Sequence, residues 1–477
     1  MKRAAAPLLA AAFLAAALLA APLGGVPLLL TTGMRADLES LVRAAEATDG
    51  AYETVRELLE AAGPRLAGSP GDARAVAWAA AALKARGFSN VHTEPVTAPH
   101  WERGEESGVL LLPVPLRLSL CALGGSVGTA PEGVEADVVE ATSLEAVDAL
   151  GEKAKGKIVF IWQVMERAAT GGGYGATVPI RSNGASRAAK VGAVAVLIRS
   201  VGTSNARFPH TGAFRYDENA PKIPAAALAV PDADLLHSYL AKGKRVRVRM
   251  SLGARKLPDV ETANVIGEIP GREKLGEVVL VGGHLDSWDL GMGAIDDGAG
   301  CGISIEAARL IGKLPKRPRR TIRVVLFANE ENGLAGGRAY AKAHAAELAR
   351  HVAAVEVDGG SGRAHGFGWI AGPAAAPLMA EIGAFLAPFG WGETKKDGGG
   401  ADIGPLRAAG VPLFSPSQDM ARYFDLHHTA DDTFDKIDRE ELNTNVATVA
   451  ALLYTLAEAE TPPERIPEAE RVERRGR

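Results

Sequence analysis

Imidazole and carboxylate side chains recur at short intervals in the second half of this chain, each time next to an apolar run. VVLVGGHLDSWDLGMGAIDDGAG (residues 278–300) carries one His-x-Asp and one Asp-Asp pair. FANEENG, VEVDGG and FDLHHTADDT follow downstream and add more groups of the same kinds. The candidates are, in chain order, His284, Asp286, Asp296, Asp297, Glu330, Glu331, Asp358, His427 and His428.

These residue types suit a centre of two divalent cations. Zinc binds imidazole nitrogen and carboxylate oxygen, and a catalytic zinc keeps one position open for water. Two ions about 3.5–4 Å apart need a shared carboxylate besides their separate ligands. One further carboxylate must stay off the metal to take the proton of the water. The adjacent pair Glu330-Glu331 can supply one residue for each role, so the pattern predicts a two-metal hydrolase.

Each motif alone also fits a structural role. Asp-Asp in a glycine-rich loop is usually a turn, and Glu-Glu before Asn-Gly fits the start of a helix. A single His-x-Asp is more often structural than ligating, and His-His in a loop is often only solvated. It is the order of the motifs, with repeated placement at strand ends, that favours a metal site.

The elements that must position these residues alternate after Pro258. EVVLVGG, TIRVVLFA and HVAAVEVD are predicted strands, and AGCGISIEAARLIGKL and NGLAGGRAYAKAHAAEL are predicted helices between them. Such alternation predicts an α/β fold with a mixed, mostly parallel sheet flanked by helices. Sites in such sheets form at the carboxyl ends of the strands, where the candidate residues fall.

The rest of the chain divides by composition. Residues 35–88 are predicted helical, 441–459 form a last amphipathic helix, and 124–254 contain strands such as GKIVFIW and AVAVLIR but no group of metal ligands. We therefore expect a catalytic unit of residues 31–123 and 255–460, a second domain of residues 124–254, and a disordered tail of residues 461–477.

The N-terminus has the layout of an export signal. Lys2 and Arg3 precede an apolar run from Ala4 to about Ala21, and the apolar character persists to Leu30. This fits a signal peptide of residues 1–30 and also an uncleaved membrane anchor. The net charge of −4, with no basic stripe, argues against nucleic acid as a partner. Cys121 and Cys301 lie among apolar or small residues and are expected to be buried thiols.

Together, His-x-Asp, Ile-Asp-Asp-Gly-x-Gly, Glu-Glu-x-Gly, Val-Asp and His-Thr-x-x-Asp-Thr resemble the motifs of the M28 family of dizinc exopeptidases. The resemblance spans roughly residues 40–460. PHWERGEES (99–107), GADIGPLRAAGVP (400–412) and YFDLHHTADDT (423–433) narrow it to a carboxypeptidase branch of that family. It implies that Asp296 bridges two zinc ions per chain. His284 and Asp358 would hold one ion, and Glu331 and His428 the other.

The same resemblance implies roles for the remaining candidates. Glu330 would be the general base. Asp286 would orient His284 from behind, Asp297 would support the backbone rather than bind metal, and the Asp296–Asp297 peptide is often cis in such proteins. His427 would polarise the scissile carbonyl, although a structural histidine fits equally well. Asn329 departs from the family pattern, which has a smaller residue there.

The resemblance also implies a phosphorylase/hydrolase-like fold in which residues 124–254 form an inserted protease-associated domain. It implies a homodimer that hydrolyses dipeptides and short peptides. From the N-terminal signal we expect export, with no stable membrane partner unless that signal stays uncleaved. Three alternatives remain open at this point. They are a glutaminyl-cyclase-like acyltransferase with one zinc, a broad-specificity aminopeptidase, and a binding protein without catalysis.

Overall fold

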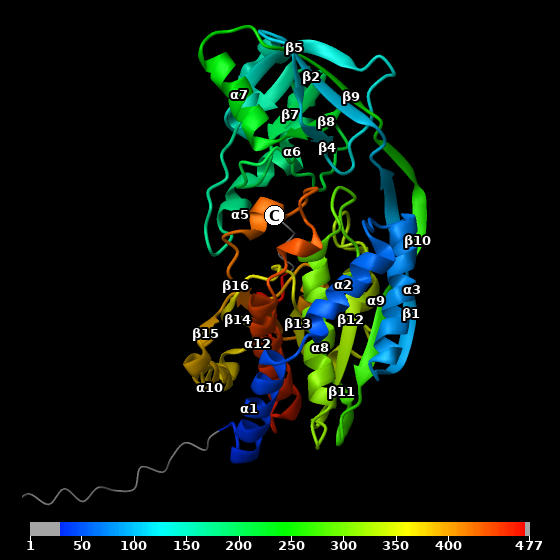
Figure 1. The fold of residues 1–477 in the computed structure, drawn as a ribbon, viewed down its shortest axis with the longest axis vertical. Helices are drawn as coiled ribbons and strands as arrows, with labels where there is room; N and C mark the ends of the chain where they lie inside the picture. Colours follow the sequence, from blue (N-terminus) through cyan, green and yellow to red (C-terminus); the bar gives the residue numbers. More distant parts are fainter. Residues whose placement is uncertain (1–28, 473–477) are drawn as a thin grey trace, which may run out of the picture.

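The computed structural model describes residues 29–472, which form two eight-stranded sheets placed one above the other along the long axis of the molecule (Figure 1). The lower sheet contains, in spatial order, β1 (Ser89–Glu102), β10 (Arg255–Ile269), β12 (Arg320–Phe327), β11 (Lys274–His284), β13 (His351–Glu356), β16 (Leu413–Gln418), β14 (Ala364–Ile370) and β15 (Glu393–Lys395).

The middle of the lower sheet is parallel. Strands β12, β11, β13 and β16 run side by side in one direction, and β1, β10 and β14 add antiparallel pairs around them. The register pairs His284 of β11 with Phe327 of β12, so the two strands end at the same level. The expected mixed, mostly parallel α/β sheet is confirmed, with its carboxyl ends pointing toward the upper sheet (Figure 1).

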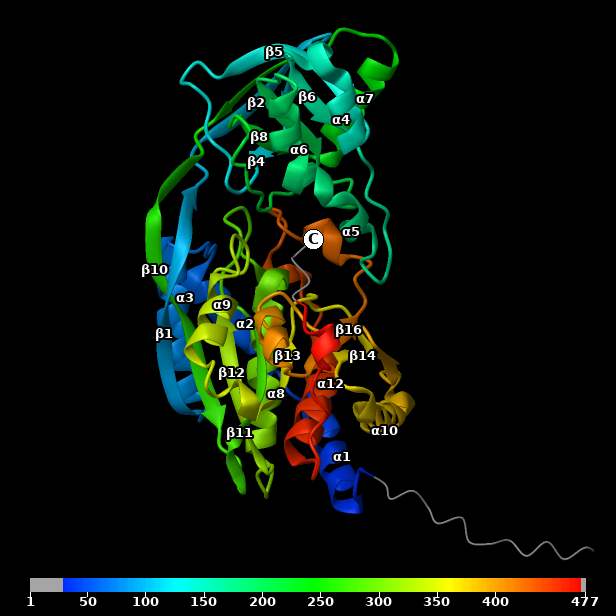
Figure 2. The ribbon, with the colours of Figure 1, turned by 180° about the vertical axis from the view of Figure 1, so that it is seen from behind.

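Helices cover both faces of the lower sheet, because its central strands are apolar on both sides. Helix α8 packs on β11 and on α12, and α1 packs on α12, which builds the larger core. Tyr340 of α9 and residues 403–411 pack on the opposite face. Helix α9 lies in front of the sheet in Figure 2. The helices of this half are α1 (Thr32–Glu46), α2 (Gly50–Ala62), α3 (Pro70–Ala85), α8 (Ala299–Gly312), α9 (Ala335–Ala343), α10 (Ala376–Leu386), α11 (Tyr423–Leu426) and α12 (Arg439–Glu458).

The upper sheet comes from the middle of the chain, and the long strands β1 and β10 connect it to the lower sheet (Figure 1). Its order is β3 (Leu116–Leu118), β2 (Glu106–Leu112), β9 (Arg247–Leu252), β5 (Val134–Ala141), β6 (Ile158–Ile161), β7 (Ala195–Arg199), β8 (Ala225–Leu228) and β4 (Leu120–Ala122). Its helices are α4 (Leu144–Leu150), α5 (Gly173–Thr177), α6 (Pro179–Lys190) and α7 (Val230–Ala241).

Two segments differ from what composition predicts. Strands β2, β3 and β4, residues 106–122, belong to the upper sheet although they precede residue 124. Residues 461–472, expected to be disordered, instead pack on the lower half, since Ile466 is fully buried and its amide donates to the carbonyl of Gly410. The Arg465 guanidinium adds hydrogen bonds to the carbonyls of Leu348 and Ala409, so apolar and polar contacts together hold this segment in place.

The expected export signal of residues 1–30 lies, except for its last two residues, outside the described part of the chain. Within residues 29–472, no helix combines the length and apolarity needed to cross a membrane. Cys121 and Cys301 are free and buried, as expected.

Candidate metal centre

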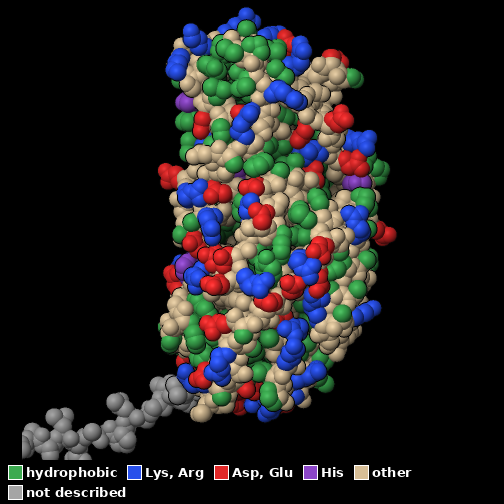
Figure 3. Space-filling view, in the orientation of Figure 1, with side chains coloured by type: hydrophobic (Ala, Val, Ile, Leu, Met, Phe, Trp, Pro, Cys, Tyr) green, Lys and Arg blue, Asp and Glu red, His purple; other side chains and the backbone are tan. Residues whose placement is uncertain are grey.

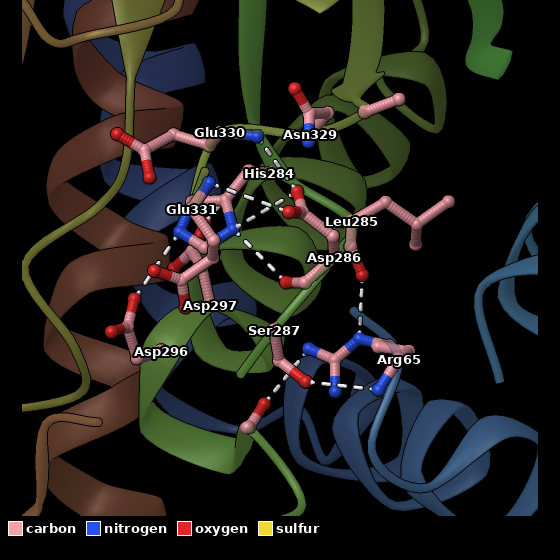
Figure 4. A network of polar contacts seen from close by, with 12 residues as sticks. Arg65, His284, Leu285, Asp286, Ser287, Asp296, Asp297, Asn329, Glu330 and Glu331 are labelled. Atoms are coloured by element: carbon pink, nitrogen blue, oxygen red, sulfur yellow. Dashed lines mark hydrogen bonds and ion pairs between the residues drawn. The ribbon is translucent and has the colours of Figure 1, made fainter. Parts of the chain in front are cut away.

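The nine candidate residues gather where the lower sheet faces the upper one. Strands β11, β12 and β13 end side by side. His284 is the last residue of β11, and the segments that follow the three strands carry six more of the nine, most of them labelled in Figure 4. The two histidines come from the segment after α11, which is drawn in orange between the two sheets (Figure 1). The fold therefore joins motifs that lie more than a hundred residues apart in the sequence.

Asp296 lies at the middle of the cluster. Its Oδ1 is 3.2 Å from Nε2 of His284, and its Oδ2 is 3.3 Å from Nε2 of His428. The carboxylate thus turns one oxygen to each side, which is the arrangement that a bridging ligand needs. Oδ2 is buried and accepts no hydrogen bond from the described residues.

Each side of Asp296 has its own further carboxylate. On one side, Oδ1 of Asp358 is 3.6 Å from Nε2 of His284. On the other, Oε2 of Glu331 is 3.0 Å from Nε2 of His428. The five residues expected to hold metal therefore form two groups that share Asp296.

Asp286 and Asp297 mainly hold the backbone of the site. The Asp286 carboxylate accepts hydrogen bonds from the amides of Glu330 (2.9 Å) and Glu331 (3.4 Å), as Figure 4 shows. Nδ1 of His284 donates to the carbonyl of Asp286 at 3.0 Å, while the carboxylate is 3.7 Å away. Asp297 accepts from the amide of His284 at 3.0 Å. The Asp296–Asp297 peptide is cis.

Glu330 follows Asn329, a fully buried residue in the left-handed conformation with φ of 59°. Asparagine adopts this conformation more readily than most residues, which accounts for its presence before the Glu pair. Glu330 is partly exposed and forms no ion pair with any described residue. It is thus a carboxylate beside the cluster that remains free to exchange a proton.

His427 lies against His428 with the rings stacked and their centroids 3.5 Å apart. Its Nε2 is 3.7 Å from Oδ2 of Asp296, so it also comes within reach of that side of the centre. Burial, followed by the charge of His428, holds the pKa of His427 well below the ordinary 6.5. The imidazole is therefore neutral at neutral pH and has one N–H to donate.

In the metal-free chain, the negative charges of neighbouring carboxylates repel one another and shift their pKa values. Burial, together with the charge of Asp296, raises the pKa of Glu331 to about 7. Burial and then the charges of Asp358 and Glu331 raise the pKa of Glu330 well above its usual range. Burial acts in the same direction on Asp296, but the imidazoles of His284 and His428 beside it outweigh burial and hold its pKa well below 3.8.

A pair of zinc ions fits this donor set. No lysine or arginine among the described residues forms an ion pair with the carboxylates of the cluster, and their described ion-pair partners are all histidines. Two imidazoles and three carboxylates offer the nitrogen and oxygen donors that zinc accepts. The unpartnered Oδ2 of Asp296 and the mutual repulsion of the acids are both relieved by divalent cations.

Several supporting residues carry no obvious mark in the sequence. Arg65 is fully buried, and its guanidinium donates to the carbonyls of Leu285 (2.5 Å), Met292 (2.6 Å) and Gly293 (2.9 Å), which shapes the loop after β11 (Figure 4). Nothing near Arg65 in the sequence points to this role, because every hydrogen bond of its guanidinium is to a distant backbone carbonyl.

Asp432 is a second supporting residue, and here the sequence did contain a signal. It is the aspartate of the His-Thr-x-x-Asp-Thr motif, and its carboxylate accepts from the amides of Ile295 (2.7 Å) and Asp296 (3.1 Å). The segment that carries His428 therefore also fixes the backbone of Asp296.

The upper half reaches into the site as well. Thr211 donates its amide to the carbonyl of His428 at 3.0 Å, and the Thr211 carbonyl accepts from Nδ1 of His428 at 3.3 Å. With Nδ1 donating, Nε2 keeps its lone pair for a metal. His210 makes a similar contact, with Nδ1 donating to the carbonyl of His427 at 2.7 Å.

Comparison with known proteins agrees with this geometry. The sequence model of peptidase family M28 matches residues 264–453, a range that includes all nine candidates. Carboxypeptidase Q of Bos taurus is 40% identical over 415 residues, which is 87% of this chain and 87% of the relative. Carboxypeptidase Q of Homo sapiens is 38% identical over the same shares.

Solved structures of similar proteins agree with the sequence matches. A peptidase M28 precursor from Shewanella amazonensis SB2B superimposes with a TM-score of 0.88 at 42% identity, covering 91% of this chain and 98% of that one. A zinc aminopeptidase from Bacillus subtilis has the same fold, with a TM-score of 0.64 at 21% identity over 88% of this chain and 98% of that one.

The resemblance inferred from the motifs is confirmed by the length and identity of these matches. The two carboxylate–imidazole groups lie inside the region that the family model covers. The chain belongs to peptidase family M28 and is a metallopeptidase.

Proposed function

We propose that this protein is an exported dizinc exopeptidase that hydrolyses dipeptides and short peptides. The observation that carries the proposal is the placement of Asp296, which turns one carboxylate oxygen toward His284 and the other toward His428. Asp358 completes one ligand set and Glu331 the other. The extensive similarity to carboxypeptidase Q supports a peptide as the substrate.

When bound, the two zinc ions would lower the pKa of a water molecule and polarise the scissile carbonyl. Glu330, which no described ion pair engages, takes the proton of the attacking water and later passes it to the leaving amine. The neutral His427 donates its N–H to the oxyanion that develops on the substrate. Asp286 keeps Glu330 in place through the Glu330 amide.

The proposal extends to the whole molecule. Residues 124–254 are the core of a protease-associated insert, residues 1–30 direct export, and two chains form a homodimer. The long match to carboxypeptidase Q relatives, which includes the insert, supports the first of these points. Acidic and basic side chains are interspersed over the face in Figure 3, which favours a peptide rather than a nucleic acid as the partner.

The first experiment is hydrolysis of a dipeptide panel by the purified protein. We expect two zinc ions per chain, loss of activity with a chelator and recovery on adding zinc. Dipeptides blocked at one end would separate aminopeptidase from carboxypeptidase preference. One zinc per chain together with cyclisation of N-terminal glutaminyl peptides would favour the single-zinc acyltransferase instead. A chain that binds peptides but hydrolyses none would be a binding protein.

A further inference from the structure

The motif Ser-Trp-Asp at residues 287–289 follows the ligand His284, yet none of its side chains has a role in the proposed reaction. The structure places it at the junction of the two halves. The Asp289 carboxylate accepts two hydrogen bonds from Arg103, from Nε at 2.8 Å and from Nη2 at 2.6 Å. Arg103 follows β1, where the chain enters the upper half, and is 8% exposed.

Arg103 connects this loop to the residue that holds His428. Its Nη1 donates to the carbonyl of Ala122 at 2.6 Å, and its Nη2 also donates to Oγ1 of Thr211 at 3.2 Å. Thr211 in turn donates its hydroxyl to the same Ala122 carbonyl at 2.9 Å. Two polar contacts thus fix Thr211, whose backbone holds the His428 imidazole and carbonyl.

Trp288 connects the same loop to Glu331. Its amide donates to Oε1 of Glu331 at 3.2 Å. Its ring is 3% exposed, packs in the apolar core of the upper half and lies 5.7 Å from the ring of His428. Gly124 of the upper half makes room for it, because a Cβ atom there would overlap the indole.

The two ligand groups differ in this respect. Glu331 and His428 both contact residues that the Arg103–Asp289 pair positions. His284 and Asp358 make their hydrogen bonds and ion pairs with residues of the lower half alone, within the described chain. A substitution that breaks the Arg103–Asp289 pair should therefore displace Glu331 and His428 and leave His284 and Asp358 in place.

We propose that Arg103 and Asp289 are positioning residues that set the affinity of one of the two metal ions, the one held by Glu331 and His428. The ion held by His284 and Asp358 does not depend on them. This inference rests on the proposed two-metal function. Groups that orient metal ligands from behind typically change metal affinity by about 10–100-fold when they are removed.

The test compares Asp289→Asn with a matched control, Asp234→Asn. Each aspartate accepts from an arginine of the upper half whose side chain is 8% exposed, Arg103 for Asp289 and Arg199 for Asp234. The Asp234–Arg199 pair lies within the upper half and makes no described polar contact with a metal ligand. Zinc per chain is measured against a series of buffered free-zinc concentrations.

We expect wild type and Asp234→Asn to hold two ions with unchanged affinities. In Asp289→Asn one ion should require about 10–100-fold more free zinc while the other keeps its affinity. Anomalous diffraction should then place the retained ion beside His284 and Asp358. Unchanged affinity for both ions, or equal weakening of both, would overturn the inference.

A second variant covers the case in which Asp289→Asn does not fold. Thr211→Val keeps the size of the side chain and its backbone contacts with His428, and removes only the hydroxyl that meets Arg103 and Ala122. It should weaken the same ion in the same selective way. Wild type that holds fewer than two ions would refute the two-metal function itself, and is thus distinguishable from failure of this inference.

Discussion

The two sheets have similar strand arrangements, but the residues that follow their strands differ in type. Each has four parallel strands at its centre, β12-β11-β13-β16 below and β5-β6-β7-β8 above. Below, the strands end in His-x-Asp, Glu-Glu and Asp. Above, β6, β7 and β8 lead into the sequences WQVM, SVGT and AVPD. A parallel sheet offers a place for a site, and the residues after its strands decide whether one exists.

The upper half nevertheless takes part in the metal centre. The amide and carbonyl of Thr211 and the imidazole of His210 contact the segment that carries His427 and His428. Arg167 adds an ion pair to Asp425 of the same segment at 2.6 Å. Strands of the lower sheet therefore carry candidate ligands at or just after their ends, whereas the upper half holds a candidate ligand in place through contacts. Substitutions in the two halves should differ accordingly.

The largest effect is expected from Asp296→Asn. Loss of the shared carboxylate charge removes a donor from both ligand groups, so both ions should bind weakly and activity should fall to background. Zinc content and dipeptide hydrolysis check this directly. Asp232→Asn, at a buried aspartate of the upper half that pairs with Arg207, should leave both readings unchanged. Equal losses of zinc and activity in the two variants would contradict the proposed difference between the lower and upper halves.

Glu330→Gln should lower kcat by about 10⁴-fold while both zinc ions remain, because the amide cannot take the proton of the water. Steady-state kinetics and metal analysis on the same preparation measure the two properties. Turnover near that of wild type would show that another group is the base.

His427→Gln should have a smaller effect, a fall in kcat of about 10²-fold at unchanged zinc content, since it removes one donor to the oxyanion. A fall in zinc content with unchanged kcat per bound zinc would instead identify His427 as a metal ligand. The 3.7 Å between its Nε2 and Oδ2 of Asp296 allows that role. This variant is informative about both halves because the segment of His427 contacts His210 of the upper half and Asp296 of the lower half.

The smallest expected effect is a decrease in the free energy of unfolding at acid pH, caused by His351 of the lower half. Burial holds the pKa of His351, on β13, at about 4 against an ordinary 6.5. The unfolded chain therefore binds more protons as the pH falls below 6.5. The stability from neutral His351 is present above that pH and is lost toward pH 4. Between pH 7 and pH 5 the loss is about 2 kcal/mol.

Hydrogen exchange of the metal-free protein at pH 7 and pH 5 can follow peptides of β13 and of β7 separately. His351→Gln should reduce the acid sensitivity of the β13 peptides, because it removes the group that titrates. Acid sensitivity that is the same with and without His351 would contradict this account of the lower half.

The sequence predicted the parts of the molecule that local patterns encode. Apolar runs such as EVVLVGG gave the central strands, and their positions before His-x-Asp and Glu-Glu located the candidate site. The boundary of the second domain was less accurate, because β2 and β4 pair with β9 and β8, which lie more than a hundred residues away in the sequence. The packed tail was missed because Ile466 is one apolar residue among prolines and charges, and Arg465 beside it binds only distant backbone carbonyls.

The supporting residues could not be predicted in the same way. Arg65 and Thr211 act on the backbone of segments that only the fold brings near, and backbone groups leave no mark in the sequence. Asp289 was visible within the Ser-Trp-Asp motif, but its partner Arg103 lies 186 residues earlier. Spacing rules detect ligands that follow strands, and they do not detect what orients those ligands.

The proposed function depends above all on two ions sharing Asp296. Diffraction data from crystals of the zinc-loaded protein, collected above and below the zinc absorption edge, locate those ions. We expect two anomalous peaks about 3.5–4 Å apart, with Asp296 between them, His284 and Asp358 beside one, and Glu331 and His428 beside the other. A single peak, or two peaks that do not share Asp296, would contradict it.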